Sequence, residues 1–115
     1  MLKKIKTSVD TQVLIGQPKY YPHDLVFILI EYFTLNSEIK KAYLGCIQYP
    51  NTSDGIKILI CIDTNADIYK IISMMSEKLD SIFMKSNVDF IDFNESQFKN
   101  YFSKIKPFYE RNDAI

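Results

Sequence analysis

The sequence AYLGCIQYPNTSDGIKILICID, residues 42–63, predicts a β-hairpin. Two apolar arms flank residues 50–55, where Pro, Asn, Ser and an Asp-Gly pair supply strong turn chemistry. The second arm has isoleucine at every other position, so we expect one face of that strand to be buried. The isoleucines of that face are Ile56, Ile58, Ile60 and Ile62, and the opposite face carries Lys57, Leu59, Cys61 and Asp63.

One strand and one helix are expected before the hairpin. Residues 11–16 are rich in β-formers and are followed by Pro18, which is typical of a strand that ends in a turn. Proline is favoured at the first position of a helix, so a helix is predicted from Pro22 to about Asn36.

A helix, a strand and a short helix are expected after the hairpin. Residues 64–67 resemble a capping box whose cap is one of the first two residues, and residues 68–82 then carry an apolar stripe at helical spacing. Residues 88–93 predict a strand, and Asn94 with Gln97 predicts the start of the last helix.

The predicted order β-α-β-β-α-β-α indicates the fold class. Its first six elements match the ferredoxin-like, or split βαβ, arrangement, in which helices cover one face of a mostly antiparallel sheet. We therefore predict a two-layer α+β fold and a single domain over residues 1–115. The residues predicted to form its core are Ile58, Ile60, Ile72, Met75 and Leu79.

Composition and charge exclude several functional classes. Apolar residues make up 47% of the chain, enough for one packed core without disulfides or metals. Fourteen Lys and Arg balance fourteen Asp and Glu, which argues against nucleic acid as a partner. The chain start lacks the apolar segment of a signal peptide, and the longest apolar run, residues 25–30, is too short to span a bilayer. A cytoplasmic protein with free thiols at Cys46 and Cys61 is expected.

The sequence offers no catalytic, cofactor or metal-binding set. His23 is the single histidine and is expected at the exposed start of a helix, while Cys46 and Cys61 lack further ligands nearby. Asp89 and Asp92 are an odd number of residues apart on one strand, so their side chains should leave opposite faces. The three glycines form no phosphate-binding loop. We therefore expect a protein that is not an enzyme and needs no cofactor.

The aromatic residues raise the question of an open sheet face. A two-layer fold leaves one face without helices, and here that face would carry Leu59, with either Tyr43 and Tyr49 or Leu44 beside it. The alternative is that the last helix or the amino-terminal segment covers it. An RNA-recognition module shares the element order, but residues 56–62 lack its aromatic residues.

Several short motifs, taken in order, resemble the carboxy-terminal domain of the enhanced serine sensitivity protein SseB. The resemblance extends from about Val13 to Arg111 and rests on Ile15-Gly16-Gln17-Pro18, Tyr21-Pro22, Ala42-Tyr43-Leu44, Ile60-Cys61-Ile62-Asp63, Val88-Asp89-Phe90 and Pro107-Phe108-Tyr109-Glu110-Arg111. It implies a non-enzyme in a free-standing copy of that domain. By analogy with other small stand-alone proteins, the leading interpretation is an immunity protein that occludes a toxin, and the alternative is a serine-tolerance or metabolic regulatory factor that binds a small molecule or an enzyme.

A partner is expected on an aromatic and acidic surface. Acidic residues crowd the 89–95 segment without a lysine among them, and an acidic patch suits a toxin with a basic active cleft. The alternative is that these acidic residues are only a solvated loop and helix caps. The residues predicted for this surface are Tyr43, Tyr49, Leu59, Asp89, Asp92, Glu95, Phe108 and Tyr109.

Overall fold

The computed structural model describes residues 3–8, 11–49, 55–94 and 97–111, with residues 3–8, 11–12 and 78–86 described by their backbone alone. The strands are β1 (Lys3–Ser8), β2 (Thr11–Gly16), β3 (Ile39–Gln48), β4 (Ile56–Thr64), β5 (Val88–Asp92) and β6 (Tyr109–Glu110). The helices are α1 (His23–Thr34), α2 (Ile68–Ser86) and α3 (Lys99–Phe102).

The predicted hairpin forms the centre of the sheet. Strands β3 and β4 pair antiparallel from Ile39 opposite Thr64 to Gln48 opposite Ile56. Along the sheet the strands lie in the order β1-β2-β3-β4-β5, and β6 pairs with the first half of β3. All pairs are antiparallel except β4 and β5, which are parallel. The mostly antiparallel α+β class is therefore confirmed.

The ferredoxin-like order of strands, in contrast, is wrong for this sheet. That arrangement would insert β2 between the two parallel strands that α2 connects. Here β4 and β5 pair directly, and β2 lies between β1 and β3. Strand β1, which the sequence analysis did not anticipate, occupies one edge of β2, and β3 occupies the other. No edge of β2 is left to pair with β4 or β5.

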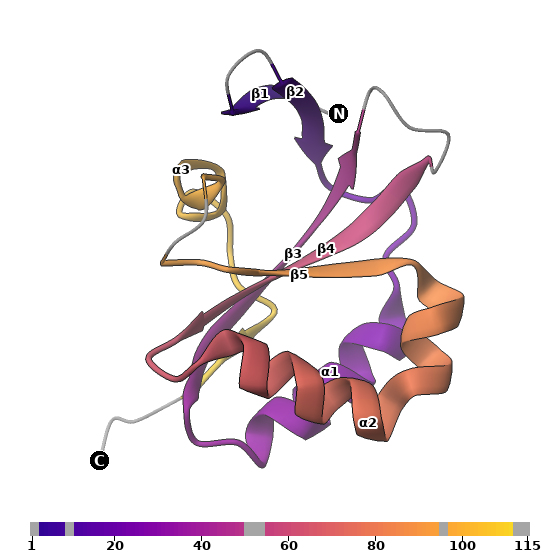
Figure 1. Ribbon diagram of the computed structural model, residues 1–115, viewed down its shortest axis with the longest axis vertical. Helices are drawn as coiled ribbons and strands as arrows, with labels where there is room; N and C mark the ends of the chain where they lie inside the picture. The colour runs from indigo at the N-terminus through magenta and orange to yellow at the C-terminus, as the bar shows by residue number, and fades with distance from the viewer. Residues whose placement is uncertain (1–2, 9–10, 50–54, 95–96, 112–115) are drawn as a thin grey trace.

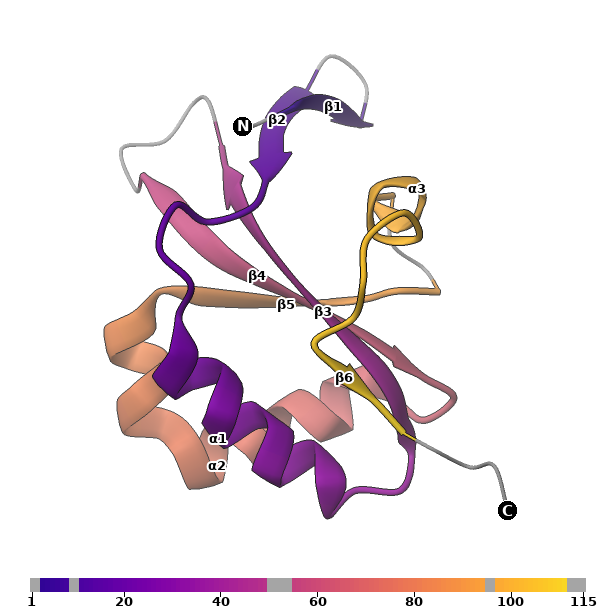
Figure 2. The same cartoon turned by 180° about the vertical axis from the view of Figure 1, so that it is seen from behind.

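Helices α1 and α2 cover one face of the sheet, as predicted, while α3 covers the other (Figures 1 and 2). The first face packs the two long helices against even-numbered strand residues such as Leu44, Ile60 and Ile62. On the second face, Phe98 and Phe102 pack against odd-numbered residues of β3 and β4 and against β2. The alternative in which the last helix covers the second face is therefore the correct one.

A side-chain cap marks the start of α2, and most of the predicted core is confirmed. The N-cap of α2 is Asp67 and not Thr64 or Asn65 as predicted, because the Asp67 carboxylate accepts a hydrogen bond from the Tyr69 backbone amide at 3.0 Å. The prediction that Asn94 caps the last helix is wrong. The side-chain amide of Asn94 donates a hydrogen bond to Asp63 Oδ1 instead, and the N-cap of α3 is Phe98. Of the predicted core residues, Ile60 and Met75 are fully buried, Ile58 and Ile72 are partly buried against the same cluster, and the Leu79 side chain lies outside the description.

A close approach at Gly45 seats α3 on the sheet. A Cβ atom at this position would lie 3.1 Å from Phe102 Cε1 and 3.2 Å from the Gly16 carbonyl oxygen. The absence of a side chain on this central strand thus allows the Phe102 ring, itself fully buried, to rest on β3.

Tyr109 and Arg111 connect β6 to the carboxyl end of α1 through hydrogen bonds. Arg111 Nη2 donates to the carbonyl oxygens of Phe33 at 3.0 Å, Thr34 at 3.3 Å and Asn36 at 2.8 Å. The Tyr109 hydroxyl also donates to the Phe33 carbonyl, at 3.2 Å. Carbonyls at the end of a helix lack partners within the helix and carry partial negative charge, so a guanidinium is well suited to bind them.

Candidate functional site

Two of the predicted surface residues belong to the core. Leu59 is fully buried and Tyr43 is 5% exposed, both beneath α3. The Tyr43 ring stacks on Phe93 with centroids 5.1 Å apart, and it contacts Phe102 at 6.0 Å. The sheet face that could have been open is thus covered by residues of the same chain, and the side chains of Tyr43 and Leu59 are not accessible at the surface.

Tyr49 and Asp89, two of the residues predicted for the partner surface, contact each other where Asp89 lies in β5. The Tyr49 hydroxyl donates to Asp89 Oδ2 at 3.4 Å, and Lys57 Nζ lies 3.9 Å from Asp89 Oδ1. Burial and the Asp89 carboxylate both raise the pKa of Tyr49. The expectation of an acidic segment without a compensating lysine therefore needs correction, because β4 supplies Lys57 from outside the segment.

Asp92 lies on the other face of β5, which confirms the predicted separation of the two carboxylates. The Asp92 carboxylate accepts a hydrogen bond from the Asn94 backbone amide at 2.9 Å. Asp63 is close by, since the Asn94 side chain donates to Asp63 Oδ1 at 3.0 Å and both carboxylates act on the pKa of Cys61. Glu95 lies outside the described residues.

Phe108 and Tyr109 are separated from this acidic region. They pack against α1, with ring centroids 6.2 Å and 5.6 Å from that of Phe33. Tyr109 pairs with β3 at Ala42, so β3 and β4 lie between it and Asp92 on β5. At the usual strand spacing this separation is about 14 Å. The predicted surface is therefore not one continuous patch.

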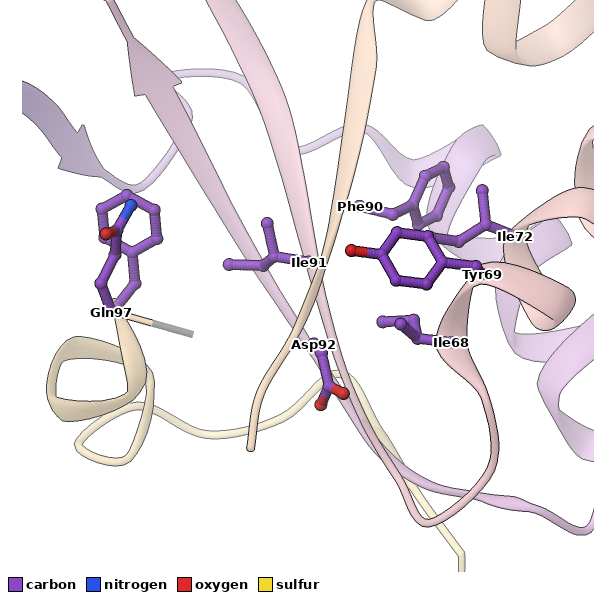
Figure 3. Close-up of a pocket in the computed structure, with 8 residues that line it drawn as sticks. Ile68, Tyr69, Ile72, Phe90, Ile91, Asp92 and Gln97 are labelled. Carbon is purple, nitrogen blue, oxygen red and sulfur yellow. The ribbon is translucent and has the colours of Figure 1, made fainter. Parts of the chain in front are cut away.

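A pocket of about 340 Å³ lies along β5 at the edge of the sheet (Figure 3). On one side of the strand it is lined by Phe90 and the start of α2, and on the other by Ile91 and the segment that leads into α3. The lining residues are Ile68, Tyr69, Ile72, Phe90, Ile91, Asp92, Gln97 and Phe98. Among the predicted site residues that the structure describes, Asp92 alone contributes to it.

Most of this pocket was not predicted, because its lining combines β5 with the start of α2 and the segment that leads into α3, which only the tertiary fold brings together. Tyr69 could have been noticed in the sequence, because it is an aromatic residue on the polar side of α2. In the structure its side chain is 76% exposed. The strand at residues 88–93 was recognised, and the ferredoxin-like order also places it at an edge, but that order gives it β2 as a neighbour, whereas it pairs with β4.

The described residues provide no metal site. No group of three or more His, Cys, Asp or Glu among them is arranged to hold an ion. His23 is exposed at the start of α1, as predicted, with its ring 4.7 Å from that of Tyr21. Cys46 and Cys61 are free and buried, and burial raises the pKa of both thiols. Within the described part of the chain, no helix is both long and apolar enough to cross a bilayer.

Comparison with known proteins places the chain in a family. The sequence matches the family of the SseB protein C-terminal domain over residues 7–111. Neither a curated protein nor a solved structure matches it. The match covers nearly the whole chain, including the motifs at Gln17 and at Tyr109 to Arg111. The chain therefore belongs to the SseB C-terminal domain family.

Proposed function

We propose that this chain is a non-catalytic protein-binding module, and specifically an immunity protein that neutralises a bacterial toxin by occluding it. The observation that carries the proposal is the pocket along β5, where apolar side chains flank an edge strand on both sides. Exposed apolar surface with aromatic residues at its rim is typical of protein-binding sites. Tyr69, which is 76% exposed, lies at this rim.

Charge around the pocket supports a basic partner. Asp63 and Asp92 meet at Asn94, and Asp67 precedes the first residue of α2 that lines the pocket. Among the described residues, no lysine or arginine forms a salt bridge with any of these three carboxylates. An acidic rim of this kind accelerates association with a basic cleft, such as that of a toxin that cleaves nucleic acid.

Co-expression tests the proposal directly. A toxin reading frame next to the gene identifies the cognate partner, and the protein is expected to restore growth to cells that express it. In a binding assay, Asp92→Lys should slow association with the purified toxin and reduce its salt dependence. Glu31→Lys, an equal charge reversal at an exposed position on α1, is the matched control and should change neither. Unchanged growth inhibition, or equal effects of the two variants, contradicts the proposal.

The second candidate function is a serine-tolerance or metabolic regulatory factor that binds an enzyme or a small molecule. Membership of the SseB C-terminal domain family supports it. Deletion of the gene should then increase sensitivity to excess serine, and the wild-type gene should restore tolerance. Unchanged growth of the deletion strain on excess serine counts against this function.

A further inference from the structure

The outer edge of β5 is the starting point, because its backbone groups are directed away from the sheet. The Phe93 amide donates to the Ile62 carbonyl, and the Ile58 amide donates to the Asn87 carbonyl, so odd-numbered residues of this segment face β4. Backbone alternation then directs the amide and carbonyl groups of Val88 and Asp92 outward. In the described parts of the chain, no strand pairs with that edge.

The shape of the pocket matches an added strand better than a compact ligand. The side chains of a strand alternate between two faces, so a strand placed beside β5 needs a receptive surface on each face. The pocket supplies both: Ile68 and Ile72 lie on the α2 side (Figure 3), and Phe98 belongs to the cluster on the α3 side. In Figure 1, β5 crosses the front of the sheet with α2 below it and α3 above it.

The charges define the chemistry and direction of the occupant. Asp92 and Asp63 lie where β5 ends, whereas Asp89 nearer its start is already paired with Lys57. A basic residue of the occupant is therefore expected beside Asp92, and apolar residues beside the rest of β5. Antiparallel pairing is somewhat more stable than parallel pairing, so the basic residues should precede the apolar ones in the occupant.

We propose that β5 extends the sheet by accepting an antiparallel strand from a partner protein, in which two basic residues precede a short run of β-branched apolar residues. This inference rests on the proposed protein-binding function and specifies how the partner is held. Main-chain hydrogen bonds to β5 supply affinity, and the pocket on each face selects the side chains.

A synthetic peptide tests strand addition without knowledge of the partner. The probe is the acetylated and amidated peptide Gly-Ser-Lys-Arg-Val-Ile-Val-Thr-Gly-Ser, added to the ¹⁵N-labelled full chain. Hydrogen exchange at the Val88 and Asp92 amides should slow by at least about tenfold at saturation. The Asp89 and Ile91 amides face β4 already and should change little. A peptide with the basic pair after the apolar run should bind at least about tenfold more weakly.

N-methylation distinguishes main-chain pairing from side-chain contact. Two versions of the probe carry N-methyl groups at alternate residues, one in each alternation. Only the version whose methyl groups face β5 should lose binding. Equal binding of both versions, no binding of the unmodified probe, or protection confined to the helices overturns strand addition.

Two further outcomes separate this inference from its alternatives. A toxin that binds the protein but leaves the Val88 and Asp92 amides unprotected overturns strand addition while the proposed function stands. Failure to protect cells from the toxin, with peptide pairing intact, refutes the immunity function and leaves strand addition standing. If sedimentation shows that the protein alone self-associates with these amides protected, the occupant is a second copy, and the partner strand is overturned.

Discussion

Removal of the Arg111 side chain should destabilise the fold through the end of α1. The guanidinium makes four contacts with carbonyl oxygens: Nη2 binds three at the end of the helix, and Nε binds Ile39 O at 3.2 Å. Nη2 carries two hydrogens and Nε one, so three full hydrogen bonds is the upper limit. The shortest, to Asn36 O, is 2.8 Å.

The expected loss for Arg111→Ala is about 2–3 kcal/mol. A hydrogen bond with a charged partner contributes about 1.5–3 kcal/mol, and the partial exposure of Arg111 reduces the total because water can replace part of the interaction. For a domain of this size the change corresponds to a fall of about 10 °C in Tm. Urea unfolding, followed by far-UV circular dichroism and by tyrosine fluorescence, measures it, since the chain contains no tryptophan.

Two further variants separate geometry from charge. Arg111→Lys keeps the positive charge near the helix end but loses the planar fork, so it should recover less than half of the lost stability. Lys106→Ala removes a charge from an exposed position nearby and should stay within about 0.5 kcal/mol of wild type. A loss below about 0.5 kcal/mol for Arg111→Ala, or full recovery by Arg111→Lys, would refute this reasoning.

Three other substitutions or treatments test the remaining packing. Ile60→Ala should lower the free energy of unfolding by about 2–5 kcal/mol, because the side chain is fully buried under α1 and α2; a near-neutral urea midpoint would contradict the strand assignment. Gly45→Ala should cost about 1–3 kcal/mol and speed hydrogen exchange in α3, because the new Cβ would lie 3.1 Å from the Phe102 ring; unchanged exchange argues against this contact. Burial holds the pKa of Cys61 far above its usual value, so the thiol stays protonated at pH 8 and should react with a thiol reagent only after unfolding in urea; rapid reaction of the native protein would contradict its burial.

The sequence predicted the elements of this fold better than their arrangement. Alternation along β4 assigned residues to the correct faces, because a side-chain period of two is a local property of the chain. The expectation that the isoleucine face is the buried one was only partly right, since Leu59 on the other face is fully buried and Ile56 is 55% exposed. The neighbours of β2 depend on β1, whose lysine-rich sequence, Lys3 to Ser8, gives little apolar alternation to detect. The prediction of the α3 cap was wrong for a related reason: the Asn94 side chain forms a hydrogen bond with Asp63, a residue of another strand.

The candidate site was predicted in part, and the errors came from tertiary contacts. Tyr49 and Asp89 do meet, and Asp92 lies at the pocket on the opposite face of β5. Tyr43 and Leu59 were misplaced because composition cannot show that Phe93, Phe98 and Phe102, around the four-residue helix α3, pack over them. The decisive feature is an outer edge of β5 with which no strand in the described part of the chain pairs, and it depends on the order of strands and not on any single segment.

Several residues of the motifs that carry the family resemblance form contacts that stabilise the fold. Arg111 and Tyr109 bind the end of α1, and the Gln17 side chain donates to the Leu44 carbonyl at 2.8 Å and to the Tyr101 hydroxyl at 3.1 Å. These contacts join the turn after β2, the centre of β3 and α3 into one unit. The pocket residues Tyr69 and Gln97 lie outside those motifs. Phe90 lies in the Val88-Asp89-Phe90 motif, so two members that share the motifs can share this architecture and the Phe90 part of the pocket and still differ at Tyr69 and Gln97. Under the proposed function, partner choice would depend on such side chains, which the fold does not require.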